Sequence, residues 1–361
     1  MLYANKPDQK EARERLNAFW NRDAIDRPAL YVTAKKTSIP NISSMIEPGE
    51  EDNWEFSPQR YCNLFTDLFD NTLYLAEAFP GAVLPWGSLL CYLAVQCGGE
   101  YEYDEIGSAW IKPLADIYER KNLVFNENHE VIDKLNAIYE KLAEALKNKA
   151  FINPPCTIEP ITTLSLFRDT DQLCLDLTDR PAQVKETIKK MSDIYIDGYD
   201  YYYKKLKKLG YGDTSSWYNT MGPDGKVDDC QCDFAVLLSP DMFEEFVVPS
   251  LCQTTDYFDY NLYHLDGTCQ MRFLDQIASI PRINGIQWNP ETTAGPPSEW
   301  IDAFKRIQEK NLGLHIWCPS ISEAKILTKE LRPEGLFLIL QTKFNSEDEA
   351  QEAINEIKNI L

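Results

Sequence analysis

The chain has 361 residues, of which 44% are hydrophobic and 12% aromatic, so it can bury a large core and is not a disordered polypeptide. Its formal net charge of −21 argues against nucleic acid and anionic membrane surfaces as partners, because both require clustered lysine and arginine. No apolar run reaches the length of a membrane span and no signal-peptide core is present. Ten cysteines without a C-x-x-C pair indicate free thiols in a reducing cytoplasm.

The first 25 residues are expected to form a helical extension ahead of a single domain over residues 26–361. Apolar residues recur at helical spacing over residues 9–21. Asp26-Arg27-Pro28 interrupts this pattern, and the apolar run over residues 29–34 predicts the first strand.

Residues 37–120 show no clear period. Proline and glycine interrupt this stretch repeatedly, which predicts a long excursion over the mouth of the fold. Trp86 and Trp110 within it either line a pocket or pack, and packing is the more frequent use of a large aromatic side chain. Helical spacing returns over residues 131–146.

From about residue 150 onward, short apolar runs alternate with helical patterns. Strands are expected at residues 156–161, 214–219, 261–266, 285–288, 312–318 and 335–343. A polar loop is expected over residues 222–232, where the acidic stretch 228–233 would bind a cation or, as is usual for acidic loops, simply be solvated.

The alternation of strands and helices predicts an α/β fold with a parallel sheet. Ser320-Ile321-Ser322-Glu323 and Ser346-Glu347-Asp348-Glu349 directly follow two of the runs, and both fit the S-x-x-E capping box of a helix start. The length favours eight strands closed into a (β/α)8 TIM barrel. An open doubly wound sheet is the alternative, although neither G-x-G-x-x-G nor a Walker A loop marks it.

Four segments carry a family resemblance: Cys232-Asp233-Phe234-Ala235, residues 238–249, Tyr263-His264-Leu265-Asp266-Gly267 and Gly285-Ile286-Gln287-Trp288. Together they resemble the uroporphyrinogen decarboxylase (URO-D) superfamily, most closely its branch near the corrinoid-linked, zinc-dependent methyltransferases. The resemblance is strong from about residue 210 onward. It implies a (β/α)8 barrel with an N-terminal helical extension and a deep site at the carboxyl ends of the strands.

The chain departs from both activities of the family. Decarboxylases carry an arginine-rich motif after the first strand and a histidine after the last, where this chain has Ala34-Lys35-Lys36-Thr37 and Gln341-Thr342-Lys343. The methyltransferases bind zinc through H-x-C and a later cysteine. His264 matches that histidine, Asp266 replaces the first cysteine, and Cys318, one strand earlier, would supply the remaining sulfur.

The candidate site is placed where the strands end, because barrel enzymes carry their chemistry at that rim. His264 and Asp266 are two residues apart, so they share one face of their strand; otherwise Asp266 is a cap and His264 a satisfied buried residue. Alternation allows either Trp317 or Cys318 to reach the rim, but not both. We expect Lys343 as a catalytic anion clamp, and substrate contacts from Trp217, Tyr218, Gln287, Trp288, Trp317, Gln341 and Arg168.

Three functions are consistent with these residues. The first is metal-assisted methyl transfer to a thiol, with zinc at His264, Asp266 and Cys318 and a methyl-corrinoid, delivered by a corrinoid protein, as donor. The second is a decarboxylase or other lyase acting on a tetrapyrrole or another acidic substrate, with Lys343 or Arg168 binding a carboxylate. The third is a non-catalytic barrel that binds a flat ligand. Each takes a small molecule, and the chain would act as a monomer or homodimer.

Overall fold

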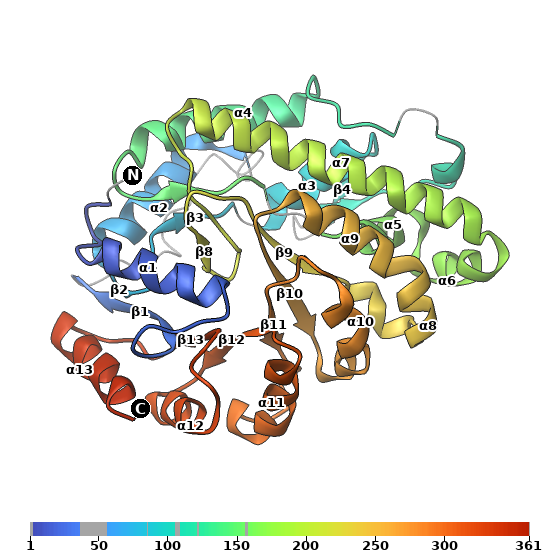
Figure 1. Ribbon diagram of the computed structural model, residues 1–361. Coiled ribbons are helices and arrows are strands. Elements are labelled where there is room, and N and C mark those ends of the chain that lie inside the picture. The colour runs from blue at the N-terminus through green and yellow to red at the C-terminus, as the bar shows by residue number, and fades with distance from the viewer. Residues whose placement is uncertain are drawn as a thin grey trace.

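The computed structural model describes residues 3–36, 56–84, 86–104, 109–120, 123–155 and 158–360. It shows a mixed α/β fold in which helices flank a mostly parallel central sheet (Figure 1). None of the helices in these ranges is both long and apolar enough to cross a bilayer.

The central sheet has seven strands in the order β2-β1-β13-β12-β11-β10-β9. All neighbours run parallel except β1 and β2, which are antiparallel. The strands are β1 (Ala29–Lys35), β2 (Thr72–Ala76), β9 (Val227–Gln231), β10 (Tyr260–Asp266), β11 (Gly285–Asn289), β12 (Gly313–Cys318) and β13 (Leu336–Leu340).

Three smaller strand pairs accompany this sheet: β3 (Gly81–Ala82) with β6 (Phe151–Ile152), β4 (Tyr101–Tyr103) with β5 (Ala109–Ile111), and β7 (Thr214–Ser215) with β8 (Met221–Gly222). Hydrogen bonds connect β7 to β9 and to the chain that follows β6. Val227 N donates to Thr214 Oγ1 at 3.0 Å, and Ser215 N donates to Asn153 Oδ1 at 2.7 Å. The mostly parallel sheet is therefore confirmed, while no continuous strand ladder closes it into a barrel within the described part of the chain.

The helices pack mainly on one face of the sheet. They are α1 (Gln9–Trp20), α2 (Pro58–Asn71), α3 (Trp86–Gln96), α4 (Glu130–Ala145), α5 (Pro160–Arg168), α6 (Thr170–Asp179), α7 (Pro181–Lys208), α8 (Pro240–Met242), α9 (Val248–Tyr257), α10 (Leu274–Ser279), α11 (Ile301–Glu309), α12 (Ile321–Glu330) and α13 (Glu347–Lys358), with short turns η3 (Ile117–Glu119), η4 (Asp233–Leu237), η5 (Phe243–Val247), η6 (Thr268–Phe273) and η7 (Pro297–Trp300). Both expected caps form, since Ser320 Oγ and Ser346 Oγ each accept a backbone N–H three residues later at 3.2 Å.

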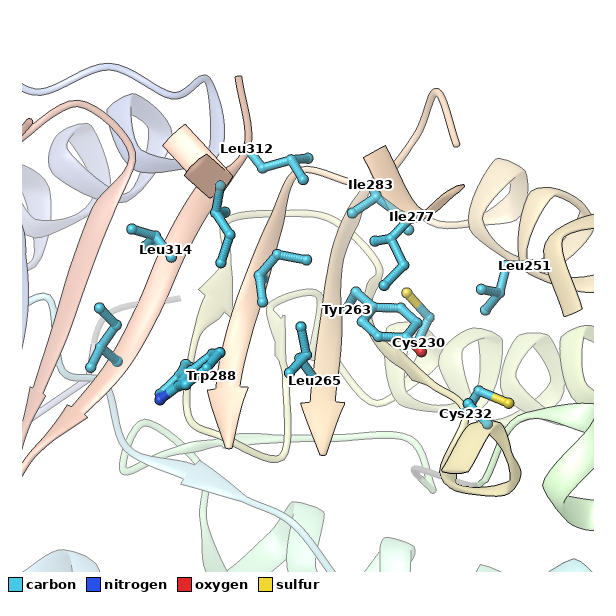
Figure 2. Packing of buried hydrophobic residues seen from close by; sticks show 14 of the residues in the cluster. Cys230, Cys232, Leu251, Tyr263, Leu265, Ile277, Ile283, Trp288, Leu312 and Leu314 are labelled. Atoms are coloured by element: carbon cyan, nitrogen blue, oxygen red, sulfur yellow. The ribbon is translucent and has the colours of Figure 1, made fainter. Parts of the chain in front are cut away.

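Strand alternation gives the sheet two distinct faces. Tyr263, Leu265 and Trp288 belong to the core that packs against the surrounding helices (Figure 2). The opposite, inner face carries Leu262 and Phe337 near the amino ends of the strands, in one cluster with Phe19 and Trp20 of α1. The expected helix over residues 9–21 thus forms as α1, and it covers the amino end of the inner face.

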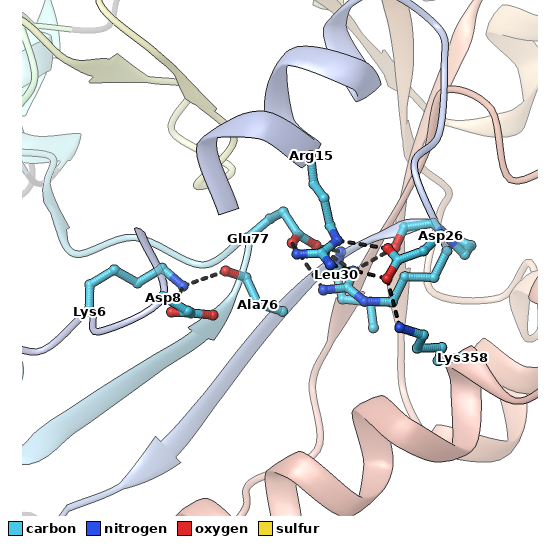
Figure 3. Close-up of polar contacts among 10 residues, drawn as sticks. Lys6, Asp8, Arg15, Asp26, Leu30, Ala76, Glu77 and Lys358 are labelled. Atoms are coloured by element: carbon cyan, nitrogen blue, oxygen red, sulfur yellow. Dashed lines mark hydrogen bonds and ion pairs between the residues drawn. The ribbon is translucent and has the colours of Figure 1, made fainter. Parts of the chain in front are cut away.

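A polar network lies beside α1 (Figure 3). The buried carboxylate of Glu77 accepts from Arg27 Nη1 at 2.6 Å and from Leu30 N at 2.7 Å. Asp26 accepts from Arg15 of α1 at 2.8 Å and from Lys358 of α13 at 2.7 Å. These bonds tie α1, β1 and α13 together.

Three sequence expectations for elements were wrong. Residues 160 and 161, expected in a strand, begin helix α5, while 156 and 157 lie outside the described residues. The strand expected over 214–219 ends at Ser215 and turns back. The polar stretch 222–232 contains β9, a buried strand of the central sheet that pairs with β10 and whose two aspartates each accept a hydrogen bond from outside the strand. Trp110 is exposed, and the side chain of Trp86 lies outside the described part.

Candidate active site

A cluster of three metal-ligating side chains lies at the carboxyl ends of β9 and β10. It consists of Asp233, His264 and Asp266, whose ligand atoms all lie within 4.8 Å of one another. His264 and Asp266 point to the inner face at the end of β10, and Asp233 begins the turn η4 that follows β9. The two-residue spacing in β10 therefore brings imidazole and carboxylate together, as strand alternation requires.

Hydrogen bonds fix the protonation of His264. Gln287 Nε2 donates to the carbonyl of Trp288 at 3.0 Å, so its Oε1 faces His264 and accepts from the Nδ1–H. Nε2 then carries the lone pair and accepts from the Tyr218 hydroxyl at 3.1 Å. Burial lowers the pKa of His264 against the opposing effects of Gln287 and Asp266. The imidazole is therefore neutral at physiological pH, the form that binds metals.

The carboxylates of the cluster are supported by amides. Asn289 Nδ2 donates to Asp266 Oδ1 at 2.7 Å, and Gln231 Nε2 donates to Asp233 Oδ2 at 3.2 Å. Burial, and then the charge of Asp266, raises the pKa of Asp233. Glu159 is a third acid beside them and is buried, and burial together with Asp233 raises its pKa.

Among the described residues, no lysine or arginine pairs with Glu159, Asp233 or Asp266. Asp266 Oδ1 lies 3.9 Å from His264 Nε2, but the imidazole is neutral and does not balance the charge. Burial first, and then repulsion between acids held close together without a cation, raises the pKa of Glu159 and of Asp233. The site therefore has the composition of a divalent-cation site.

A tight turn places Tyr218 over His264. Ser216 N donates to Thr220 O at 3.0 Å, and Asn219 adopts φ 66°, a left-handed conformation that asparagine tolerates better than most residues. Trp217 N donates to the buried carboxylate of Asp229 at 2.7 Å. The Tyr218 ring consequently stacks on the His264 ring, with centroids 4.9 Å apart and planes at 22°.

An aromatic and proline-rich cavity of about 500 Å³ adjoins the cluster. It touches the cluster through Tyr218, which bonds His264, and through Asn289, which bonds Asp266. The residues that line it are Tyr218, Trp288, Asn289, Pro290, Glu291, Thr292, Gly295, Pro296, Pro297, Trp317, Pro319 and Gln341. We call it the tryptophan cavity.

Most of the expected substrate contacts lie around this site. Tyr218, Trp288, Trp317 and Gln341 line the tryptophan cavity, and Gln287 bonds His264. The Trp217 ring lies 6.0 Å from that of His264. Sequence reasoning thus located this part of the site, although the substrate roles of these residues stay predictions.

Three expected site residues are not brought to the cluster. Arg168 lies at the far end of α5 and donates to Asp176 at 2.6 Å. Lys343 is exposed beyond β13 and does not line the cavity. Cys318 points to the helix-covered face, where its Sγ lies 3.9 Å from Ile316 O and burial raises the thiol pKa. Trp317, its neighbour in sequence, is the residue that reaches the site, and Asp233 takes the third position expected for Cys318.

Sequence reasoning missed two acids of the site. Asp233 was expected in an acidic loop. It reaches the site because β9 is a strand that ends just before it, and the sequence did not predict that strand. Glu159 was not singled out. Glu159-Pro160 nevertheless has the pattern of a helix start, and its side chain does accept from Thr162 N at 2.8 Å.

Comparisons with known proteins show the fold and no more. No family model matches the chain, and no curated protein sequence matches it. Among solved structures it is similar to a methyltransferase from Methanosarcina mazei, with a TM-score of 0.58 and 12% sequence identity over 96% of this chain and 98% of that one. The two proteins therefore share an overall fold along almost their whole length.

Proposed function

We propose that this protein is a methyltransferase in which a divalent metal, with zinc as the first candidate, is held by Asp233, His264 and Asp266. The observation that carries the proposal is the convergence of these three ligand groups at one sheet edge. The fold shared with a methyltransferase supports it. We further propose that a thiol is the methyl acceptor and that a methyl-corrinoid, presented by a corrinoid protein, is the donor.

The chemistry of the donor set fits a metal. Histidine nitrogen and aspartate oxygen are both zinc ligands, and His264 has a free Nε2 lone pair once the Tyr218 hydroxyl turns away. A metal-bound histidine usually donates its other N–H to a fixed acceptor, the role that Gln287 already fills. When bound, the metal would act as a Lewis acid that lowers the pKa of a thiol.

The protein's own side chains orient the reactants. Gln287 holds the imidazole in one tautomer, and Asn289 holds Asp266 toward the cluster. Tyr218 covers His264 from the side of the tryptophan cavity and limits water there. The proton released by the thiol would pass to solvent, because Asp233 and Asp266 are engaged as ligands when the metal is bound.

The surroundings of the site favour this proposal over a lyase that acts on a carboxylate-rich tetrapyrrole. Such a substrate needs cations, yet no lysine or arginine is found among the described residues that line the tryptophan cavity. Arg168, expected to bind a carboxylate, is engaged by Asp176, and Lys343 lies outside the cavity wall. A non-catalytic barrel would have no need of the three converging ligand groups.

The test is the metal content of the purified protein together with its methyl transfer. After dialysis against zinc we expect about one zinc per chain, lost in His264→Ala and retained in His129→Ala, whose side chain caps α4. Methylcobalamin and a small thiol should then yield a thioether with the wild type and not with His264→Ala. A wild type that binds no metal overturns the proposal.

We also propose that the sheet belongs to a closed barrel and that the protein works in the cytoplasm. The pairs β3–β6 and β7–β8 bridge the distance from β2 to β9 in the manner of a barrel wall, with residues 1–25 as an extension of a single domain over 26–361. The nine cysteines in the described ranges are all free thiols, which supports a reducing cytoplasm.

A further inference from the structure

The walls of the tryptophan cavity form an aromatic corner beside the ligand cluster. The rings of Tyr218 and Trp317 stand at 83° to each other with centroids 6.3 Å apart. Trp288 contributes a further ring, and four prolines complete the apolar lining. Aromatic faces set at right angles are the arrangement that surrounds a rounded cation, because each face presents the negative side of its quadrupole.

The charge around this corner has one sign. Of the described residues that line the cavity, Glu291 is the one that is charged, and hydrogen bonds from Thr268 lower the pKa of its carboxyl. Asp266 lies directly behind Asn289. Such a wall repels carboxylates and sulfonates and attracts a cation, particularly one without a tight hydration shell.

Two indole N–H groups in the wall have no partner. Trp288 Nε1 and Trp317 Nε1 are buried atoms without a hydrogen bond among the described residues, and both tryptophans line the cavity. Trp288 itself is only 1% exposed, and Figure 2 shows its indole at the carboxyl end of β11. A buried donor without an acceptor is costly. Both nitrogens lie below the cavity surface, so a ligand oxygen reaches one of them once its indole has turned toward the cavity.

We propose that the tryptophan cavity binds a methylated onium compound, a quaternary ammonium or a sulfonium that also carries an oxygen acceptor. Its methylated centre would lie between Tyr218 and Trp317, and its oxygen would accept from one of the indole N–H groups. The site thereby selects a cation over an anionic substrate.

If the proposed function holds, this onium is a second methyl donor to the same thiol, beside the methyl-corrinoid. The thiol first loses its proton to solvent. The thiolate sulfur then forms a bond to the methyl carbon, while the carbon–nitrogen or carbon–sulfur bond of the onium breaks and its electron pair stays on the departing neutral amine or thioether. The step balances without an oxidant or reductant.

The first test is a binding comparison that needs neither metal nor turnover. Choline and its uncharged isostere 3,3-dimethyl-1-butanol have nearly the same shape, and each is titrated into the purified protein by calorimetry. We expect choline to bind at least about tenfold more tightly, since only the cation gains from the aromatic faces. Equal affinity, or no binding of choline, overturns the inference.

Three variants locate the binding in the cavity. Trp317→Leu should weaken choline at least about tenfold, whereas Trp110→Leu, at an exposed tryptophan elsewhere, should leave it unchanged. Glu291→Gln keeps the shape of this exposed rim residue and should weaken choline while leaving the isostere unaffected. Choline binding that is insensitive to both Trp317→Leu and Glu291→Gln contradicts the assignment.

The outcomes separate this inference from the proposed function. A chain that binds choline in the cavity but holds no metal keeps the onium site and loses the methyltransferase mechanism. A chain that binds zinc and uses methylcobalamin, but not choline, keeps the mechanism and loses the onium site. Thioether formed from choline and a thiol, without any corrinoid, supports both.

Discussion

At the scale of single residues, Gln287 has a larger role than its uncharged side chain suggests. It is fully buried, accepts from His264 Nδ1 and donates to the next residue's carbonyl. It lies beside His264 because the two residues are register partners in β10 and β11. It thereby decides which imidazole nitrogen faces the cluster.

Gln287→Leu should impair metal binding more than the fold. Without the amide, the Nδ1–H of His264 is buried and unpaired, which costs about 1–3 kcal/mol of folding free energy, and zinc affinity should fall by about 10–100-fold. Zinc titration and urea unfolding measure the two effects. Gln351→Leu, at an exposed position on α13, should change neither. Undiminished zinc affinity in Gln287→Leu would show that Gln287 does not support the site.

Zinc affinity should rise with pH between about 5 and 8. The carboxyl of Asp233 has a raised pKa, so at the acid end of this range it retains a proton that a metal must displace. Competition titrations at several pH values measure the slope. Asp233→Asn, which cannot titrate, should bind zinc more weakly and with a smaller pH dependence. An identical slope in both proteins would assign the dependence to another group.

The residues of the site were only partly predictable. The spacing of His264 and Asp266 was sufficient to place them together, and alternation correctly allowed just one of Trp317 and Cys318 at the rim. The choice between those two depends on how β12 faces its neighbours, which the local sequence does not encode. Asp233 was missed because its position depends on the strand before it.

At the scale of elements, β9 shows why a strand can be hidden in a sequence. Its residues Val227-Asp228-Asp229-Cys230-Gln231 have the composition of a loop, yet all five are buried. The Tyr195 hydroxyl donates to Asp228, and Trp217 N donates to Asp229, so partners distant in sequence bond one oxygen of each acid, while the other oxygen of each is buried without a partner among the described residues. The strand propensity of single residues predicts a strand poorly where tertiary hydrogen bonds determine the backbone conformation. By contrast, β10 to β13 are apolar and were predicted closely.

Helix α1 should contribute strongly to stability although it precedes the sheet. Trp20 is 2% exposed, stacks near Tyr260 at 4.9 Å and donates its indole N–H to Met221 O at 2.9 Å. Trp20→Ala should therefore lower the free energy of unfolding by about 3–5 kcal/mol. Ile25→Ala, at a side chain that is 57% exposed, is the control and should have little effect. Equal unfolding midpoints for the two variants would mean that α1 is not docked in solution.

At the scale of the whole molecule, acidity and burial combine to set the response to pH. The chain carries a net charge of −21, and several of its acids are buried in and beside β9. Burial raises the pKa of Asp228 from 3.8 to about 7. The folded state therefore keeps a proton between pH 4 and 7 that the unfolded chain has released, so stability should fall as pH rises through this window.

Asp228→Asn should reduce this fall. One pKa unit corresponds to about 1.4 kcal/mol, so the fully buried carboxyl of Asp228 accounts for several kcal/mol at most, and Asp229 and Glu159 would retain the remaining dependence. Urea midpoints at pH 5 and pH 8 measure the change, with Asp241→Asn on α8 as an exposed control. A wild type that gains stability between pH 5 and pH 8 would contradict the assignment.

The pairing of β1 with β13 has a consequence for how the protein is made. Ala29 aligns with Phe337, so the two strands are separated by roughly 300 residues of chain, which a ribosome adds in about 15–60 s. Throughout that interval β1 can pair with β2 on one side, but its other edge has no strand to bind. The nascent chain therefore displays an open sheet edge for most of its synthesis, and chaperones that recognise such edges would have this interval in which to act.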